Sequence, residues 1–122
     1  MKPSLPQGEK ECLFCSIAGK KIPSKIVYED EKGVAFEDIN PQAPVHLLIV
    51  PKAHIVSLST VKPEELGTIA HLFSTVPRLA EKNGLLEAGF RTVVNSGAAA
   101  GQTVLHLHIH LLGGRAFRWP PG

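Results

Sequence analysis

Three histidines alternate with apolar residues in the segment from His106 to His110, near the end of the chain. Side chains of a β-strand point alternately to its two faces, so a strand here would carry the three imidazoles on one face. The other face, which includes Leu105 and Leu111, is expected to lie in the core. A single histidine on a strand is usually a surface residue without a task. Three in strict alternation reverse that preference and predict a functional site.

Two kinds of chemistry fit such a row of imidazoles. One is a catalytic metal site with an open coordination position, although His106 and His110 would lie ~13 Å apart along a strand, too far to share one ion easily. The other is nucleophilic catalysis, in which a neutral imidazole nitrogen attacks phosphorus and forms a covalent intermediate. That chemistry requires a nucleophile in one tautomer, donors for the phosphate oxygens and a proton source for the leaving group.

A loop of small residues, Asn95 to Gly101, directly precedes the histidine segment and is followed by Gln102 and Thr103. Its backbone N–H groups, together with the amide and the hydroxyl, are suited to hold a phosphate without adding positive charge. The position of this loop favours nucleophilic attack on phosphorus.

The elements that must position these residues are strands and one long helix. Hydrophobic patterns predict strands over residues 26–29, 34–38, 45–51, 90–94 and 104–112, and a short helix over 16–20. A long helix is expected from Pro63 to the Asn83-Gly84 stop signal, with a kink at Pro77. The predicted fold class is α+β: an antiparallel sheet of about five strands, with one main helix packed on it.

Length and composition limit the possible functions. The chain has 122 residues, and we expect a flexible segment over residues 1–10 and a single domain over 11–122. Its 13 basic and 11 acidic residues are spread along the chain, without the basic stripe of a nucleic-acid-binding protein. No apolar run approaches the ~20 residues that would span a membrane. The start of the chain has no apolar signal segment, so a cytoplasmic location is expected.

Cys12 and Cys15 have the spacing of half a tetrahedral zinc site. In a cytoplasmic protein, a metal site or free thiols are expected in preference to a structural disulfide. A free dithiol, or cysteines that serve as small apolar residues, remain open alternatives.

Several segments together resemble the histidine-triad (HIT) superfamily, whose signature is His-φ-His-φ-His-φ-φ with φ apolar. The sequence HLHIHLL at 106–112 matches it at every position. Similarity to the Hint branch covers nearly everything after residue 11 and is carried by DINPQAP at 38–44, His46, PKAH at 51–54, VVN at 93–95, GQT at 101–103 and WPPG at 119–122. The WPPG ending differs from the Fhit branch, and the third histidine differs from the glutamine of the uridylyltransferase branch.

This resemblance implies a homodimeric purine nucleoside phosphoramidase whose sheet continues across the dimer. Its substrates would be AMP or GMP joined through a P–N bond to an amine such as lysine, and catalysis would need no cofactor. The middle histidine, His108, would be the nucleophile, His110 would contact the phosphate and His46 would orient the nucleophile. Gln102 and Thr103 would bind the phosphate and position the leaving group or water.

The resemblance also implies the nucleotide-binding residues. Asp38 would accept hydrogen bonds from the ribose hydroxyls. Asn95 and Gly101 would lie near the ribose and phosphate, and Trp119 would reach the site of the other subunit. The base pocket would be formed by apolar residues, for which a simple core role remains equally open: Leu13, Phe14, Ile17, Phe36, Ile39 and Leu48.

In members of the superfamily that carry CxxC, the metal site is completed by two histidines. Here these would be His54 and His106, which is therefore expected both among the catalytic residues and as a ligand. A zinc ion held by Cys12, Cys15, His54 and His106 would be structural and would fasten the N-terminal segment to the catalytic strand.

The leading hypothesis is therefore a hydrolase of nucleoside phosphoramidates. The alternatives are a nucleotide-binding regulatory protein whose catalysis is incidental, and a zinc-dependent hydrolase. The expected partners are a small purine nucleotide and a second copy of the chain, with no nucleic-acid polymer and no membrane.

Overall fold

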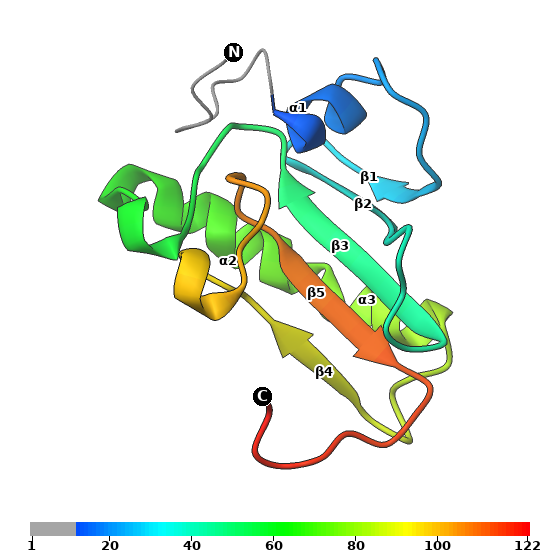
Figure 1. The fold of residues 1–122 in the computed structure, drawn as a ribbon. Coiled ribbons are helices and arrows are strands. Elements are labelled where there is room, and N and C mark those ends of the chain that lie inside the picture. Colours follow the sequence, from blue (N-terminus) through cyan, green and yellow to red (C-terminus); the bar gives the residue numbers. More distant parts are fainter. Residues whose placement is uncertain (1–11) are drawn as a thin grey trace.

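The computed structural model describes residues 12–122 (Figure 1). The flexible segment expected over residues 1–10 lies outside the described residues. Five strands form one sheet, and neighbours are antiparallel in the order β1-β2-β3-β5-β4. Their bounds are Ile26–Glu29 (β1), Gly33–Glu37 (β2), Val45–Pro51 (β3), Phe90–Val93 (β4) and Ile109–Gly113 (β5). The predicted α+β class with a five-stranded antiparallel sheet is confirmed.

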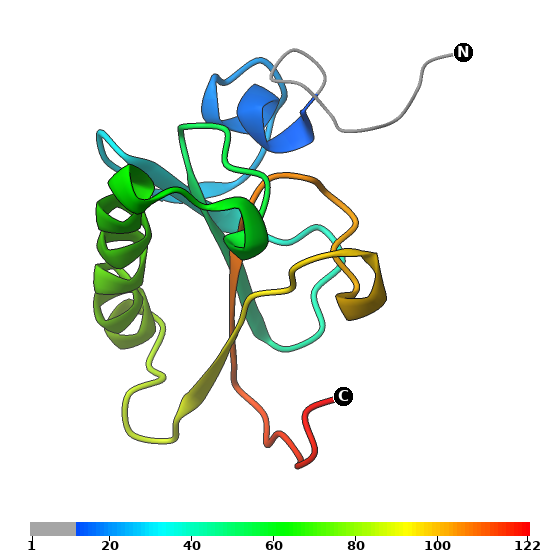
Figure 2. The same cartoon turned by 90° about the vertical axis from the view of Figure 1, so that its left-hand side faces the viewer.

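The helices are α1 (Leu13–Ala18), α2 (Leu66–Ser74) and α3 (Val76–Lys82), with 3-10 turns η2 (Leu58–Thr60), η3 (Pro63–Glu65) and η4 (Ala98–Ala100). Figure 2 shows α2 and α3 along one face of the sheet, with η4 on the other side. The short helix expected over 16–20 begins earlier, because Cys12 is its N-cap. The Sγ atom of Cys12 accepts the N–H of Cys15 at 3.4 Å.

The long helix is bent, as predicted from Pro77. Segments α2 and α3 meet at Thr75, two residues before the proline. Proline has no N–H to donate to the preceding turn, so the helical hydrogen bonding is interrupted there. At the break, the carbonyl of Leu72 accepts both the hydroxyl of Thr75, at 2.7 Å, and the backbone N–H of Thr75, at 3.1 Å.

Alternating side chains of the sheet form two hydrophobic clusters, one on each face. The cluster under α2 and α3 contains Ala35, Leu47, Ile49, Leu72, Val76, Leu79, Leu107, Ile109 and Leu111. The cluster under α1 contains Cys12, Phe14, Ile17, Val34, Phe36, Leu48 and Val50. Both faces of the central strands are therefore covered over part of their length. Helix α1 lies on the same side of the sheet as His46 of β3 and His110 of β5.

The strand expected over 104–112 is shorter than predicted and begins only at Ile109. Its ladder with β3 stops before Pro51 and Leu107 would pair, since proline has no N–H to donate. The carbonyl of Pro51 instead accepts Nε2–H of His106 at 2.8 Å. The N–H of Leu107 donates to the carbonyl of Ile55 at 2.6 Å. The segment that precedes Ile109 therefore lies outside the sheet.

This early departure corrects the expectation of three imidazoles in a row on one strand face. His106 and His108 both precede β5, and His106 is fully buried, at 0% exposure. Leu105 was expected in the core but is half-buried and also lies outside the strand. The apolar alternation holds from Leu107 onward, because Leu107, Ile109 and Leu111 all join the cluster under the helices.

Candidate functional site

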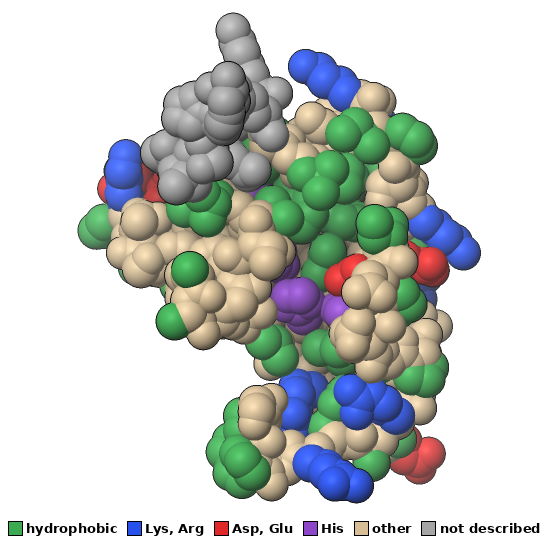
Figure 3. Space-filling view, viewed as in Figure 1, with side chains coloured by type: hydrophobic (Ala, Val, Ile, Leu, Met, Phe, Trp, Pro, Cys, Tyr) green, Lys and Arg blue, Asp and Glu red, His purple; other side chains and the backbone are tan. Residues whose placement is uncertain are grey.

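A pocket of about 390 Å³ opens on the face of the sheet that carries α1. In Figure 3 the histidine side chains lie at the bottom of a hollow bordered by hydrophobic and acidic side chains. The pocket brings together ten of the residues expected from the sequence: Leu13, Phe14, Ile17, Phe36, Asp38, Ile39, Leu48, Thr103, His108 and His110. Sequence reasoning missed Ile22, Pro23, Ser24, Glu37 and Val104, which also line it and carry no motif that would have indicated this.

His108 is held in one tautomer. Its Nδ1 lies 2.7 Å from the carbonyl oxygen of His106, which can only accept, so Nδ1 carries the proton. A neutral imidazole has one protonated nitrogen, and Nε2 is therefore left with its lone pair. Burial lowers the pKa of His108 below that of a free imidazole, which keeps the ring neutral at physiological pH. The ring thus has the tautomer and the charge of a nucleophile.

His46 and His110 form a second fixed pair. Nδ1 of His46 accepts the backbone N–H of Gln42 at 3.0 Å, so the proton of His46 resides on Nε2. That Nε2–H lies 2.9 Å from Nδ1 of His110 and donates to it. Nε2 of His110 must then carry a proton, which makes it a hydrogen-bond donor at the pocket.

Burial is also the main reason that this pair stays neutral. It lowers the pKa of His46, against the opposing effect of the Asp38 carboxylate. The pKa of His110 falls to about 4, because of burial first and of the neighbouring His108 and His46 next. The Asp38 carboxylate also approaches this pair, with Oδ2 3.4 Å from Nε2 of His46.

The Asp38, His46 and His110 side chains are close enough to hold a metal ion, with ligand atoms within 4.8 Å of one another. Their hydrogen bonds do not suit one. A ligating imidazole nitrogen must be unprotonated, whereas the N–H of Gln42 on Nδ1 of His46 keeps the proton on Nε2. Two of the three side chains, His46 and His110, form a hydrogen-bonded relay that orients His110, and the trio does not favour the catalytic-metal alternative.

The loop before the histidines is arranged differently from the expected phosphate cradle. Internal hydrogen bonds already engage the N–H groups of Gly97, Ala100, Gly101 and Gln102. The side-chain amide of Gln102 donates to the carbonyls of Val56 and Val104, and its oxygen accepts from Gly97. Gln102 therefore holds the loop in shape. Two of the expected phosphate donors line the pocket: Thr103, with its hydroxyl, and His110, with its ring N–H.

Five other expected residues lie away from the pocket wall. His46 and His106 are buried behind it, at 6% and 0% exposure. Gly101 ends η4 in the left-handed region at φ 93°, which favours glycine. Asn95 is half-buried, and Trp119 is 82% exposed on the C-terminal tail.

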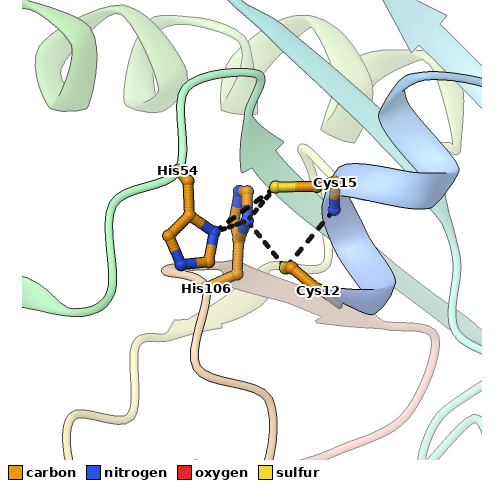
Figure 4. Close-up of side chains that lie close together, drawn as sticks. All are labelled: Cys12, Cys15, His54 and His106. Carbon is orange, nitrogen blue, oxygen red and sulfur yellow. Dashed lines mark hydrogen bonds between the residues drawn. The ribbon is translucent and has the colours of Figure 1, made fainter. Parts of the chain in front are cut away.

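The four expected metal ligands converge from three separate segments (Figure 4). Nδ1 of His106 lies 3.2 Å from Sγ of Cys12 and 3.5 Å from Sγ of Cys15. Nδ1 of His54 lies 3.3 Å from Sγ of Cys15 and 3.2 Å from Nδ1 of His106. All four ligand atoms are within 4.8 Å of one another.

The protonation of these groups fits a cation at their centre. His106 donates Nε2–H to the carbonyl of Pro51, which leaves the Nδ1 lone pair directed into the cluster. Burial lowers the pKa of His106 to about 4, so the ring is neutral as a ligand must be. Nε2 of His54 is buried with no partner among the described residues. Two thiols and two imidazoles in this arrangement match the donor set of structural zinc.

The family model of the HIT domain matches residues 19–117. The chain therefore belongs to the HIT family, and the resemblance found in the sequence is confirmed. Among the described residues, none of the helices has the length and apolar character needed to cross a bilayer.

Within the family, the chain is similar to hydrolases and to zinc-binding members. A HIT family hydrolase from Legionella pneumophila has 48% identity and a TM-score of 0.89, with 91% of this chain and 99% of that one covered. A 14 kDa zinc-binding protein of Zea mays has 46% identity, with 90% and 87% covered. A Zn-bound histidine triad protein from Mycobacterium smegmatis has 35% identity and a TM-score of 0.75, with 94% and 86% covered.

Proposed function

We propose that the protein hydrolyses nucleoside 5'-phosphoramidates in two displacements through a covalent nucleotidyl-histidine at His108. In the first, the lone pair of Nε2 attacks the α-phosphorus, the P–N bond to the amine breaks, and the amine leaves with a proton. In the second, water attacks the same phosphorus, the P–Nε2 bond breaks, and the nucleoside monophosphate is released. Splitting one displacement into two is the general benefit of a nucleophilic catalyst.

The observation that carries the proposal is the bond from Nδ1–H of His108 to the carbonyl of His106, 2.7 Å long. It supports attack by Nε2, because it fixes the proton on the other nitrogen. It also supports the covalent intermediate, since the carbonyl can stabilise the ring when Nε2 becomes bonded to phosphorus and the imidazole gains positive charge.

Two groups at the pocket wall can donate hydrogen bonds to the phosphate oxygens: Nε2–H of His110 and the hydroxyl of Thr103. The proton for the leaving amine comes from solvent, because removing a proton from the neutral His46–His110 pair would leave an imidazole anion beside the Asp38 carboxylate.

A purine nucleotide suits the shape and polarity of the pocket. Its volume of about 390 Å³ lies within the usual range for small-molecule sites. Phe14 and Phe36 form an edge-to-face pair with centroids 5.5 Å apart at the apolar end. Asp38 lies at the polar end, where a carboxylate can accept hydrogen bonds from the ribose hydroxyls.

We also propose that Cys12, Cys15, His54 and His106 hold a structural zinc ion. When bound, the ion would supply a crosslink between α1, the segment after β3 and the segment before β5. The donor set and the zinc-binding relatives support this assignment, and no step of the reaction passes through the metal.

A homodimer with a continuous sheet is proposed on the strength of the sheet's edge. β4 is the last strand in the sheet order, and an edge strand presents unpaired backbone groups that a second copy can pair with. The indole of Trp119 is 82% exposed, which is unusual for so large an apolar side chain and is consistent with burial against a partner.

The proposed function is tested by trapping the intermediate. The protein is mixed with an AMP phosphoramidate, denatured within seconds at alkaline pH to protect the acid-labile P–N bond, and analysed by intact mass and peptide mapping. We expect an adenylyl group on His108 and none in His108→Ala. The matched control His71→Ala, whose histidine lies on α2 and does not line the pocket, should still form the adduct. An adduct on another residue, or none, would overturn the proposal.

A further inference from the structure

Helix α1 takes part in both candidate sites although it has only six residues. Cys12 and Cys15, at its start, provide the two thiols of the metal cluster. Leu13, Phe14 and Ile17 of the same helix line the nucleotide pocket. A shift of this helix therefore changes both sites at once.

Phe14 lies between the metal cluster and the proposed nucleophile. Its ring is 4% exposed and meets three other aromatic rings edge-on. The centroid distances are 5.9 Å to His106 and 5.0 Å to His108, with interplanar angles of 71° and 87°. The third contact, at 5.5 Å, is with Phe36 of the pocket wall. The position of Phe14 thus affects a ligand, the nucleophile and the base pocket.

His106 provides a second link along the backbone. Its side chain belongs to the metal cluster, while its carbonyl fixes the tautomer of His108. The ring of His106 is fastened at Nε2 to the carbonyl of Pro51 and at Nδ1 only by the cluster.

In the protonation state that binds a cation, the cluster becomes unfavourable once the cation leaves. With both rings protonated on Nε2, the Nδ1 lone pairs of His54 and His106 face each other at 3.2 Å and repel, so protons must return to the cluster or the groups must move apart. Loss of the ion would separate these groups and release the thiol end of α1. What then holds α1 is the packing of its buried residues, Cys12, Phe14 and Ile17, against the sheet.

We propose that metal binding at Cys12, Cys15, His54 and His106 and nucleotide binding in the pocket strengthen each other, with Phe14 as the residue that couples them. The inference rests on the proposed function, since it takes the ligand of the pocket to be a nucleotide. Coupling between two sites is reciprocal, so each ligand must raise the affinity of the other by the same factor. Phe14 is a positioning residue in this scheme, because it acts through His108 and the pocket wall.

The test measures both affinities, with AMP and zinc as probes. The AMP dissociation constant is determined by calorimetry on zinc-loaded and on chelator-stripped protein. The zinc dissociation constant is determined in metal buffers with and without saturating AMP. We expect about a tenfold weakening in each case, within the usual range of coupling. Equal AMP affinity, within twofold, in loaded protein and in stripped protein that remains folded by near-UV circular dichroism would overturn the proposal.

Two variants keep the test decisive if the stripped protein unfolds. Phe14→Leu preserves apolar packing but removes the three ring contacts, and we expect its coupling factor to fall below about twofold while both ligands still bind. Leu13→Ala, the matched control, changes a pocket residue of α1 that makes none of these ring contacts. It should weaken AMP binding equally with and without zinc. Coupling through unfolding alone would persist in Phe14→Leu, and that result would overturn the assignment of Phe14.

The inference and the proposed function fail in different ways. If zinc-loaded wild-type protein binds no AMP and forms no adduct on His108, the proposed function is wrong. If it binds AMP and forms the adduct, but zinc leaves the AMP affinity unchanged, only the coupling is wrong.

Discussion

Nε2 of His46 lies 2.9 Å from Nδ1 of His110, and the proton between them belongs to His46. The assignment follows from the backbone N–H of Gln42, which occupies the other nitrogen of His46. One main-chain donor thus determines the tautomers of two imidazoles in succession, and the second imidazole presents a proton to the pocket. The chain from the backbone to His110 runs through neutral imidazoles, with the Asp38 carboxylate beside Nε2 of His46.

Replacing His46 should therefore impair catalysis although it does not line the pocket. In His46→Ala, His110 loses the partner that fixes its tautomer. One hydrogen bond of this kind is worth about 1.5 kcal/mol, and its loss lowers kcat/KM roughly tenfold or more. Steady-state hydrolysis of an AMP phosphoramidate measures the effect, with His71→Ala as the control that stays at the wild-type rate. An unimpaired His46→Ala enzyme would show that the relay has no role.

The pH dependence of activity should differ from that of an ordinary histidine enzyme. An imidazole with its usual pKa of about 6.5 would be only about one-quarter neutral at pH 6. Burial lowers the pKa of His46, so this ring becomes protonated at a lower pH than a free imidazole, and the pKa of His110 falls to about 4, so that ring remains neutral well below pH 6.5. We expect the decline of kcat/KM on the acid side to lie below pH 6.5, with His110 losing its neutral form as the pH approaches 4. A decline centred near pH 6.5 would contradict these protonation states.

Removal of the metal should reduce stability and nucleotide affinity but not the chemical step. Treatment with a strong chelator is expected to lower Tm by several degrees and to raise KM, because the crosslink at His54 and His106 is lost. At saturating substrate, the adduct on His108 should still form at a similar rate. A zinc-dependent hydrolase would instead lose the reaction in folded, metal-free protein, and rapid-quench measurement of adduct formation separates the two.

Asp30 should stabilise the hairpin of β1 and β2 in a pH-dependent way. Burial raises the pKa of its carboxyl, but hydrogen bonds from Tyr28, His71 and the N–H groups of Lys32 and Gly33 outweigh this and hold the pKa well below its usual value. A carboxyl with a lowered pKa contributes stability above its unfolded pKa of about 3.9, and the contribution is lost as the pH falls below that value.

We accordingly expect Asp30→Asn to lower the free energy of unfolding by about 2 kcal/mol at pH 6, as for the loss of one hydrogen bond to a charged group. The difference from wild type should shrink at pH 3. Urea denaturation at the two pH values measures it, and a difference that does not depend on pH would show that the charge of Asp30 contributes nothing.

Much of the fold follows from local sequence patterns. The strands over 26–29 and 45–51 have the predicted bounds, and the bend near Pro77 occurs because proline lacks a donor. Periodicity also places His108 and His110 on the side of the chain opposite Ile109 and Leu111. What local patterns cannot supply is the pairing partner: β5 is shortened by Pro51, a residue more than fifty positions away.

The differences within the site have a similar origin. Gln102 was expected at the phosphate, but its amide groups satisfy backbone groups of its own loop and of Val56. Such bonds depend on the folded path of the loop, which composition does not reveal. Ile22 to Ser24 were missed because they join the pocket only through the packing of α1 against the sheet.

The proline at the end of β3 has a consequence for how one short segment supplies two sites. Had the ladder continued as far as residue 106, all three histidines would have lain in the sheet, and the thiols of α1 would have lacked a fourth donor. The interruption turns this one imidazole away from substrate and toward the helix. The alternating segment, which periodicity alone would predict to be one uniform row, therefore has two tasks. His106 takes part in the metal cluster, while His108 and His110 line the pocket.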